Sequence, residues 1–438
     1  MEAGGEARRG FRPSIQAVVL AGGEAVRMRP LSQATQKGLL PVANKPLICS
    51  QLELLAKAGL KDVIIVTVEE AADSMRSIAA GYASMDVAVE VSDETGTADV
   101  LRQIQPKLYT DFLVMTCDLL TDMSLDAVLD KHRVNQGALT VLFTRETLED
   151  EKTKKKKKTE DYVIVDESSD ALLMLLQKSE IKKDNFDVRR LLLQKYPRVS
   201  ICNDLQDVHL YIFAHWVTDL LNQKPDFTSI KQHVVPFLLR KQYSMSEADL
   251  AAFPKQANGN THDLAMQNSS QTPSWKPGPP GAEQLHCHRV VVEAAQVPCT
   301  RVSTLTAFGE ANRLAARRYR PDDAAKETLA KLKAAWPRLV GSECVIGTGL
   351  VAKEGCSIKK SVVGNNCVLG ADVKIVNCVL MNDITIEDGC SLSGVVVGSG
   401  ARLGEKCQLK EGTVIAHRHY LVAGTEAKNE HYPRPDHM

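Results

Sequence analysis

Two glycines and two basic residues near the start of the chain have the types and spacing to bind phosphate groups. Gly22 and Gly23 come directly after an apolar run at residues 15–20, and Arg27 and Lys37 follow shortly after. Glycines after a first strand let backbone N–H groups approach phosphate oxygens. An arginine and a lysine nearby can neutralise a triphosphate. The segment is therefore a candidate nucleotide-binding loop.

The elements that must position this loop alternate between strands and helices. Buried strands are predicted by short apolar runs at residues 15–20, 62–68, 87–91, 112–116 and 138–143. Between the first two runs, Ile48, Leu52 and Leu55 recur at helical spacing, and Gly59 suits the end of that helix. Buried strands separated by helices predict a doubly wound α/β domain with a mostly parallel sheet, for which we expect the bounds 14–250.

From residue 340 the pattern changes to apolar hexads nested in a seventeen-residue period. The first column of this period is Ile346, Val363, Leu380 and Val397, continuing at Val414. Three hexads make one coil of three short strands, and stacked coils bury continuous columns of side chains. A corner column of residues that tolerate positive φ is Gly349, Asn366, Asp383 and Gly400. The repeat predicts a parallel β-helix over 340–420.

The other segments have the composition of linkers, loops or ends. Residues 251–285 are rich in Asn, Gln, Ser, Pro and Gly, so we expect a disordered linker. We also expect a flexible N-terminus at 1–13, a connecting segment at 286–339 and a C-terminal tail at 421–438. The lysine run from Lys154 to Lys158 is expected to be a solvated loop, with a nucleic-acid patch as the alternative.

Composition limits the class of protein. With 54 basic and 54 acidic residues the formal net charge is zero, which excludes a bulk polycation. No apolar run is long enough to span a membrane, and the N-terminus lacks the apolar core of a signal peptide, so we expect a cytosolic protein. The 11 cysteines are scattered singly and are expected to be buried thiols. Cys287, between His286 and His288, is only faintly ligand-like, and no metal or cofactor is expected.

The loop resembles the signature of the sugar-phosphate nucleotidyltransferases. The chain reads Leu20-Ala-Gly-Gly-Glu-Ala-Val-Arg-Met-Arg-Pro-Leu-Ser32, then Lys37-Gly-Leu-Leu-Pro-Val42. The resemblance implies a domain that joins a sugar 1-phosphate to a nucleoside triphosphate, with Arg27 and Lys37 near the triphosphate. It also implies that Asp118 holds Mg²⁺, which suits a carboxylate, and that the β-helix is left-handed.

Several positions depart from that signature. Ala25 replaces the third loop glycine, Val26 replaces a threonine, and Gln36 and Gly38 replace the prolines beside Lys37. A Cβ at position 25 would crowd a backbone folded around phosphates, and a glycine at position 38 loosens the backbone that should fix the lysine. No convincing second metal aspartate occurs late in the domain. We therefore expect a degenerate site without catalytic residues.

The relic of a nucleotide site would consist of Gly22, Gly23, Arg27, Lys37 and Asp118. It either binds a nucleotide without chemistry or has lost the ligand, and the sequence leaves both possibilities open.

A second set of strings resembles the family of gamma subunits of eukaryotic translation initiation factor 2B. The strings are Gly96-Thr-Ala-Asp-Val-Leu-Arg102, Cys117-Asp-Leu-Leu-Thr-Asp122, Lys195-Tyr-Pro-Arg-Val199, Asp207-Val-His-Leu-Tyr211, Thr228-Ser-Ile-Lys231, Pro236-Phe-Leu-Leu-Arg-Lys-Gln242, Cys299-Thr-Arg-Val-Ser-Thr-Leu305 and Glu310-Ala-Asn-Arg313. The resemblance as a whole is spread from residue 15 to about residue 430.

This resemblance implies a non-catalytic subunit of the guanine-nucleotide exchange factor for initiation factor 2. Its expected partners are the epsilon subunit, which carries the exchange domain, the other subunits of factor 2B, and initiation factor 2 as substrate of the complex. Nucleic acid and membranes are not expected as direct partners. The alternatives are an active pyrophosphorylase and an acyltransferase on the β-helix, for which His417 and His419 are the candidate histidines, against the simpler interpretation that both are surface residues.

Overall fold

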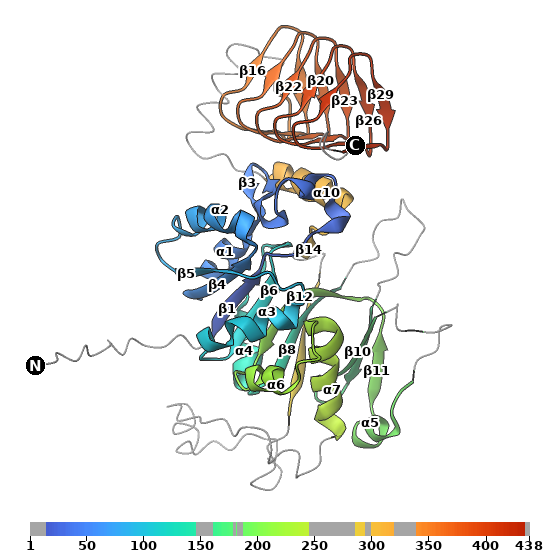
Figure 1. The fold of residues 1–438 in the computed structure, drawn as a ribbon. Helices are drawn as coiled ribbons and strands as arrows, with labels where there is room; N and C mark the ends of the chain where they lie inside the picture. Colours follow the sequence, from blue (N-terminus) through green and yellow to red (C-terminus); the bar gives the residue numbers. More distant parts are fainter. Residues whose placement is uncertain are drawn as a thin grey trace, which may run out of the picture.

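The computed structural model describes residues 15–145, 161–177, 181, 187–244, 285–293, 299–318 and 339–433. The expected flexible N-terminus at 1–13, the run from Lys154 to Lys158 and the expected linker except residue 285 lie outside the described residues. Figure 1 shows an α/β part, mostly coloured blue to green, and an orange-to-red β-helix, with α10 (Leu305–Arg318) between them. No helix in the described ranges is long and apolar enough to cross a membrane.

The α/β part is built on a seven-stranded sheet with the strand order β13-β8-β12-β6-β1-β4-β5. Its strands are β1 (Gln16–Leu20), β4 (Asp62–Thr67), β5 (Asp86–Val91), β6 (Phe112–Thr116), β8 (Leu139–Arg145), β12 (Leu205–Phe213) and β13 (Cys287–Glu293). All neighbouring pairs are parallel except the two that involve β12. The predicted mostly parallel sheet is confirmed.

Helices cover both faces of this sheet because successive strand residues point to opposite sides. Val18 and Ile64 share one apolar cluster with α3 (Thr97–Ile104), α6 (Val217–Gln223) and α7 (Val235–Ser244). Val19 and Ile65 face the other way, into a cluster with α1 (Leu47–Lys57), α2 (Glu69–Ala79) and α4 (Asp126–Val134). This is the doubly wound arrangement expected from the alternation of strands and helices.

Beside this sheet lies a smaller three-stranded antiparallel sheet, which the sequence patterns did not indicate. Its strands are β9 (Asp161–Asp166), β10 (Leu172–Gln177) and β11 (Val199–Cys202). The short helix α5 (Arg190–Lys195) lies between β10 and β11 along the chain. Ile164 and Leu192 pack in a small apolar cluster of their own, whereas Val163 and Val165 on the other face of β9 pack in the cluster that also contains Val18 of the large sheet.

The large sheet does not end near residue 250, where we expected the domain boundary. Strand β13 belongs to the segment expected to be only a connection, yet it pairs in parallel with β8, with Cys287 opposite Leu139 and Glu293 opposite Arg145. The apolar run from Val290 to Val292 explains this pairing. Val291 packs in the apolar cluster on one face of the sheet, and Val290 and Val292 pack in the cluster on the other face. The chain therefore returns to the α/β part at residue 287 and adds an edge strand to its sheet.

The β-helix has three faces, each a parallel sheet. The first contains β15 (Val345–Ile346), β18 (Val362–Val363), β21 (Val379–Leu380), β24 (Val396–Val397), β27 (Val414–Ile415) and β30 (His431–Tyr432). The second contains β16 (Val351–Ala352), β19 (Val368–Leu369), β22 (Thr385–Ile386), β25 (Arg402–Leu403) and β28 (Tyr420–Leu421). The third contains β17 (Ser357–Lys359), β20 (Lys374–Val376), β23 (Ser391–Ser393), β26 (Gln408–Lys410) and β29 (Glu426–Lys428).

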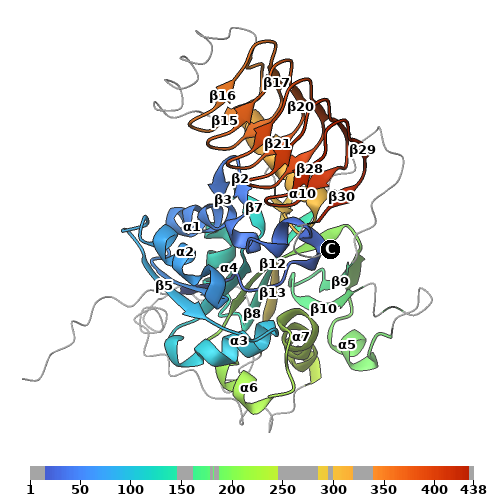
Figure 2. The same cartoon turned by 45° about the horizontal axis from the view of Figure 1, so that its top comes forward.

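The predicted left-handed β-helix is confirmed, and so are its corners. The corner residues Gly349, Asn366, Asp383 and Gly400 have φ of 73°, 54°, 59° and 71°. Glycine reaches this region at little cost and asparagine or aspartate more easily than other residues. The inward residues Val363, Leu380 and Val397 are fully buried. Figure 2 shows the stacked coils from a second direction.

Two details of the predicted repeat are wrong. Val397 pairs with Ile415 rather than with Val414, and Val414 pairs with Val396. The coil between β24 and β27 contains one extra residue at the corner between Lys410 and Val414, where Gly412 has φ of 85°. The coil also continues past residue 420, because β29 and β30 extend into the segment expected to be a tail.

The two parts of the molecule are joined by β14 (Cys299–Arg301) and α10 (Leu305–Arg318), with the hairpin of β2 (Pro41–Val42) and β3 (Lys45–Pro46). Met28, Leu31 and Phe308 belong to the same apolar cluster as the columns of the β-helix. Asn44 donates a hydrogen bond from Nδ2 to the carbonyl oxygen of Val363, at 2.8 Å. Figures 1 and 2 both show α10 beside the β-helix. The candidate phosphate loop is thus packed against the C-terminal half.

Candidate functional site

Asp118 is the centre of the candidate site. It follows β6 directly, at the carboxyl end of the parallel strands, and its side chain is 1% exposed. Thr116 donates a hydrogen bond to Oδ1 at 2.5 Å, and the Lys37 ammonium pairs with Oδ2. Arg301 adds a second cation, with Nη2 at 3.0 Å from Oδ2. Two cationic side chains therefore share one buried carboxylate.

These contacts decide the ionisation of the site. Burial alone would raise the pKa of Asp118, but Arg301 and Lys37, with the hydrogen bonds from Lys37 and Thr116, hold it well below its usual range. The same burial raises the pKa of the neighbouring Cys117 thiol to about 12, although Lys37 opposes the shift. The site therefore holds a permanent carboxylate beside an inert thiol.

Lys37 is held by a short 3₁₀ helix, η3 (Lys37–Leu39), that closes with a hydrogen bond from the Leu40 N–H to the Lys37 carbonyl at 3.2 Å. Gly38 in this helix is buried. A Cβ there would lie 3.0 Å from Cε of Met75 and 3.6 Å from Cβ of Cys117. Packing therefore favours a glycine at position 38, because the missing Cβ lets the backbone of η3 lie close to Met75 and Cys117.

Ala25, which stands where the resembled signature has its third glycine, adopts a backbone conformation typical of glycine. Ala25 has φ of 47° and ψ of 46°, in the left-handed region. Its carbonyl accepts hydrogen bonds from the N–H of Met28 at 2.8 Å and from Oγ of Ser32 at 2.9 Å. Gly23 and Arg27 are exposed, and Gly22 is partly buried.

The structure therefore brings only part of the predicted set together. Lys37 and Asp118 form an ion pair. Within the described ranges no hydrogen bond or ion pair joins Arg27 to that pair, and Gly22 and Gly23 lie at the end of the adjacent strand β1. The residue that sequence reasoning missed is Arg301. Its string was recognised as part of a family resemblance, but nothing local signals a partner 183 positions away.

A second polar cluster lies close to the first. A bulge in β12 between Asp207 and Tyr211 gives His209 a φ of 58°. Asp207 accepts hydrogen bonds from the His209 N–H at 2.8 Å and from the Tyr211 hydroxyl at 2.6 Å. Lys231 pairs with both Asp161 and Asp207, at 2.7 and 3.5 Å. Burial lowers the pKa of His209 to about 4, aided by the positive charges of Arg301 and Lys231 and opposed by Asp207.

Comparison with known proteins matches both halves of the chain. A nucleotidyl transferase family model matches residues 16–153, and a model of the EIF2B subunit epsilon LbH domain matches residues 330–426. The translation initiation factor eIF2B subunit gamma of Dictyostelium discoideum is 30% identical over 390 residues, covering 81% of this chain and 88% of that protein. The chain belongs to the family of eIF2B gamma subunits.

Other relatives define the breadth of the similarity. The eIF2B subunit gamma of Schizosaccharomyces pombe is 28% identical over 356 residues, covering 78% of this chain and 73% of that protein. The mannose-1-phosphate guanyltransferase of Saccharomyces cerevisiae is 25% identical over 246 residues, covering 55% of this chain and 60% of the enzyme. Similarity to this gamma subunit thus covers more of the chain than similarity to the enzyme. The predicted family is confirmed.

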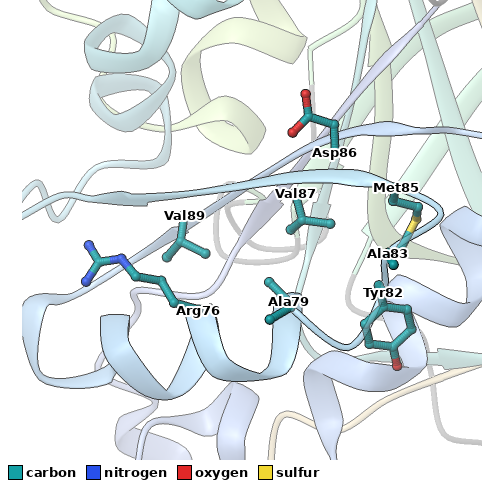
Figure 3. A pocket seen from close by; sticks show the side chains of 9 residues that line it. Arg76, Ala79, Tyr82, Ala83, Met85, Asp86, Val87 and Val89 are labelled. Atoms are coloured by element: carbon teal, nitrogen blue, oxygen red, sulfur yellow. The ribbon is translucent and has the colours of Figure 1, made fainter.

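Two hollows on the surface lie apart from Asp118. One, of about 600 Å³, lies between α1, α10 and the strand β7 (Leu119–Thr121), and it is lined by Lys45, Glu53 and Asp122 among others. The other, of about 470 Å³, lies at the sheet edge, where Val87 and Val89 of β5 point toward Ala79 of α2 (Figure 3). Neither is lined by any of the five predicted site residues.

The other predicted candidates do not form sites. Cys287 is buried, burial raises the pKa of its thiol, and His286 and His288 stack on one another with ring centroids 6.1 Å apart. Among the described residues no group of three or more His, Cys, Asp or Glu side chains could hold a metal ion.

The surface interpretation of His417 and His419 is wrong. They are only 6% and 7% exposed, because the coil continues past residue 420 and covers them. His417 Nδ1 accepts a hydrogen bond from the Ser399 N–H, and the ring of His419 packs against Tyr432. Both histidines thus have structural surroundings in the last coils.

Proposed function

We propose that this chain is a non-catalytic subunit of the guanine-nucleotide exchange factor for translation initiation factor 2. In this proposal it forms a subcomplex with the epsilon subunit, assembles with the other subunits of factor 2B, and supports GDP-for-GTP exchange on initiation factor 2. The observation that carries the proposal is the extent of the similarity to eIF2B gamma subunits, which spans the α/β part and the β-helix alike. In this proposal the chain acts in the cytosol and contacts neither nucleic acid nor a membrane directly.

The state of the nucleotidyltransferase-like site supports a non-catalytic role. Catalysis of nucleotidyl transfer needs positioned groups that are available to the substrate. Asp118 is buried and already engaged by Lys37 and Arg301, while Arg27 lies exposed and apart from that pair. We propose that Gly22, Gly23, Arg27, Lys37 and Asp118 are the relic of a nucleotide site that no longer turns over substrate.

The architecture suits a subunit that works through its surfaces. A β-helix and a doubly wound domain that share one apolar cluster give a large, rigid body. In the proposed division, residues 14–250 form the α/β domain together with β13, residues 251–285 are the linker, and 286–339 otherwise connect it to the β-helix. Rigid surfaces of this kind can hold a catalytic partner in a defined position.

An exchange assay tests the proposal. Release of a fluorescent GDP analogue from initiation factor 2 is followed with this chain alone, with the epsilon subunit alone, and with both in equal amounts. We expect the chain alone to leave the release rate at its intrinsic value and to raise the rate given by epsilon severalfold. If stoichiometric addition leaves the epsilon rate unchanged although the two proteins co-purify, the proposal is wrong.

The similarity to mannose-1-phosphate guanyltransferases favours a second candidate, a true pyrophosphorylase. The discriminating assay measures pyrophosphate released from GTP, UTP or ATP with hexose 1-phosphates and Mg²⁺. We expect no release above that of the Lys37→Ala variant. Release by the wild-type chain that Lys37→Ala abolishes would replace the non-catalytic proposal.

A further inference from the structure

The position of Asp118 invites a test of whether it still fits a divalent cation, as the nucleotidyltransferase resemblance implies. Mg²⁺ binds carboxylate oxygens at close range and keeps several water ligands. At Asp118 both oxygens already accept hydrogen bonds, Oδ1 from Thr116 and from Arg301 Nε at 3.4 Å, and Oδ2 from Lys37 and Arg301. The side chain is 1% exposed, so little room remains for a hydrated ion.

The local charge also opposes a metal. Lys37 and Arg301 together carry one positive charge more than Asp118 can balance. A divalent cation beside them would meet two like charges in a site of low dielectric, where such repulsion is strong. The residues present therefore do not fit Mg²⁺.

We infer that Arg301 supplies, from within the chain, the positive charge that the nucleotidyltransferase resemblance assigns to a divalent cation at Asp118. We also infer that the ion pair between Arg301 and Asp118 stabilises the connection between the two halves of the molecule. The inference does not depend on the proposed exchange function.

The backbone around Arg301 shows how the fastening works. Strand β14 pairs antiparallel with β7, with Arg301 opposite Leu119, immediately after Asp118. The Val302 N–H donates to the carbonyl oxygen of Asp118 at 2.8 Å. Side chain and backbone of Asp118 thus both hold the segment that leads into α10.

Helix α10 connects the segment held by Asp118 to the β-helix. Its Asn312 is fully buried, accepts a hydrogen bond from the Ala43 N–H at 3.0 Å and donates one to the Phe308 carbonyl at 3.1 Å. Phe308 and Ala311 on the same helix pack in the cluster that contains the β-helix columns. Asn44, next to Ala43, reaches the Val363 carbonyl in the second coil. A continuous set of contacts therefore leads from Asp118 to the β-helix.

The experiment compares the full-length wild-type chain with Asp118→Asn, Arg301→Gln and Arg301→Lys. The matched control is Arg318→Gln, because Arg318 also links α10 to the loop after β7, through an exposed ion pair with Asp122 at 2.8 Å. Two readouts are taken: binding of Mn²⁺, from the loss of the free-ion electron paramagnetic resonance signal, and hydrogen exchange of residues 299–312.

We expect Mn²⁺ binding to be the same in the wild-type chain and in Asp118→Asn. Exchange in residues 299–312 should quicken by at least about tenfold in Arg301→Gln, less in Arg301→Lys, and not at all in Arg318→Gln. If Asp118→Asn does not fold, the wild-type chain is measured alone and is expected to show no stoichiometric Mn²⁺ binding. Stoichiometric Mn²⁺ binding by the wild-type chain that Asp118→Asn abolishes would overturn the inference. So would unaltered exchange in Arg301→Gln.

Discussion

Ala25 and His209 both occupy the left-handed backbone region, with φ of 47° and 58°. For residues with a Cβ this conformation costs roughly 1–2 kcal/mol, so surrounding contacts must hold it. Ser32 and Met28 do so for Ala25, and Asp207 does so for His209. Both residues therefore keep a strained backbone conformation because neighbouring hydrogen bonds hold it.

The buried histidine predicts a pH dependence. Because the pKa of His209 is about 4 in the folded chain and is near its ordinary value in the unfolded chain, the unfolded state binds its proton first as pH falls. Stability is therefore full above the ordinary histidine pKa and is lost as pH falls toward 4. Between pH 7 and pH 5 we expect the wild-type chain to lose about 2 kcal/mol more unfolding free energy than His209→Asn.

Denaturant unfolding at the two pH values measures this difference. Asparagine is the chosen replacement because it tolerates positive φ. His288, whose pKa burial also lowers to about 4, is present in both proteins and cancels in the comparison. Parallel pH profiles for the two proteins would contradict the assignment of this effect to His209.

At the scale of elements, each coil of the β-helix depends on close approach between neighbouring turns. Gly347, Gly364 and Gly398 follow inward residues of the first face, and a Cβ on any of them would lie within 3 Å of backbone atoms in the next coil. The corner glycines Gly389 and Gly400 are a different case, because they have positive φ, and the nearest atom to an added Cβ would be a side-chain carbon at 3.4 and 3.3 Å. The repeat therefore contains two kinds of glycine with different tolerance.

Gly364→Ala tests the close-approach kind. Its Cβ would lie 2.5 Å from the carbonyl group of Met381, which is backbone and cannot turn aside. We expect a loss of about 3 kcal/mol in unfolding free energy, from overpacking between coils. The corner variant Gly389→Asn is the control, since asparagine tolerates the φ of 75° there and its nearest neighbour is the flexible side chain of Lys406 at 3.4 Å. Equal losses in the two variants, measured by thermal and denaturant unfolding, would show that space between coils is not limiting.

At the scale of the whole molecule, the first face of the β-helix is the side that meets the rest of the chain. Its outward residues Val362, Val379 and Val396 are 2%, 3% and 7% exposed, whereas Val351 and Val368 on the second face are 59% and 41% exposed. The buried side of this asymmetry lies toward α10, which contacts β18. The two halves therefore act as one body through a shared apolar contact.

Asn312 is a buried polar residue at this contact, and its side chain accepts a hydrogen bond from the Ala43 N–H. Asn312→Leu leaves the Ala43 N–H without its acceptor in a buried place, which costs about 1–3 kcal/mol. We expect a lower unfolding temperature and faster hydrogen exchange at residues 41–44 and 345–363. Glu310→Ala, on the exposed side of the same helix, should change neither. If Asn312→Leu leaves exchange in the β-helix unaltered, the halves are coupled by apolar packing alone.

The sequence by itself determined the features that depend on local pattern. Apolar runs separated by helical spacing were sufficient for the doubly wound sheet, since each strand and helix shows its period within a few residues. The hexads determined the β-helix for the same reason, and the corner residues are of the types that tolerate the φ observed at Gly349 and Asn366. Asp118 could be predicted as a member of the same site as Lys37 only through a family resemblance, and the ion pair between them was not predicted.

Tertiary structure alone decided the contacts between distant segments. No local periodicity indicates the pairing of β13 with β8, the extra residue before Val414 or the ion pair between Asp118 and Arg301. Each of these contacts depends on which surfaces meet after the chain has folded. The sequence does not show which opposite charge a buried carboxylate will contact, because packing decides which side chains lie near it. The same residue types that suggested a metal-binding enzyme site therefore form an internal ion pair, because a second cation arrives there from 183 positions away.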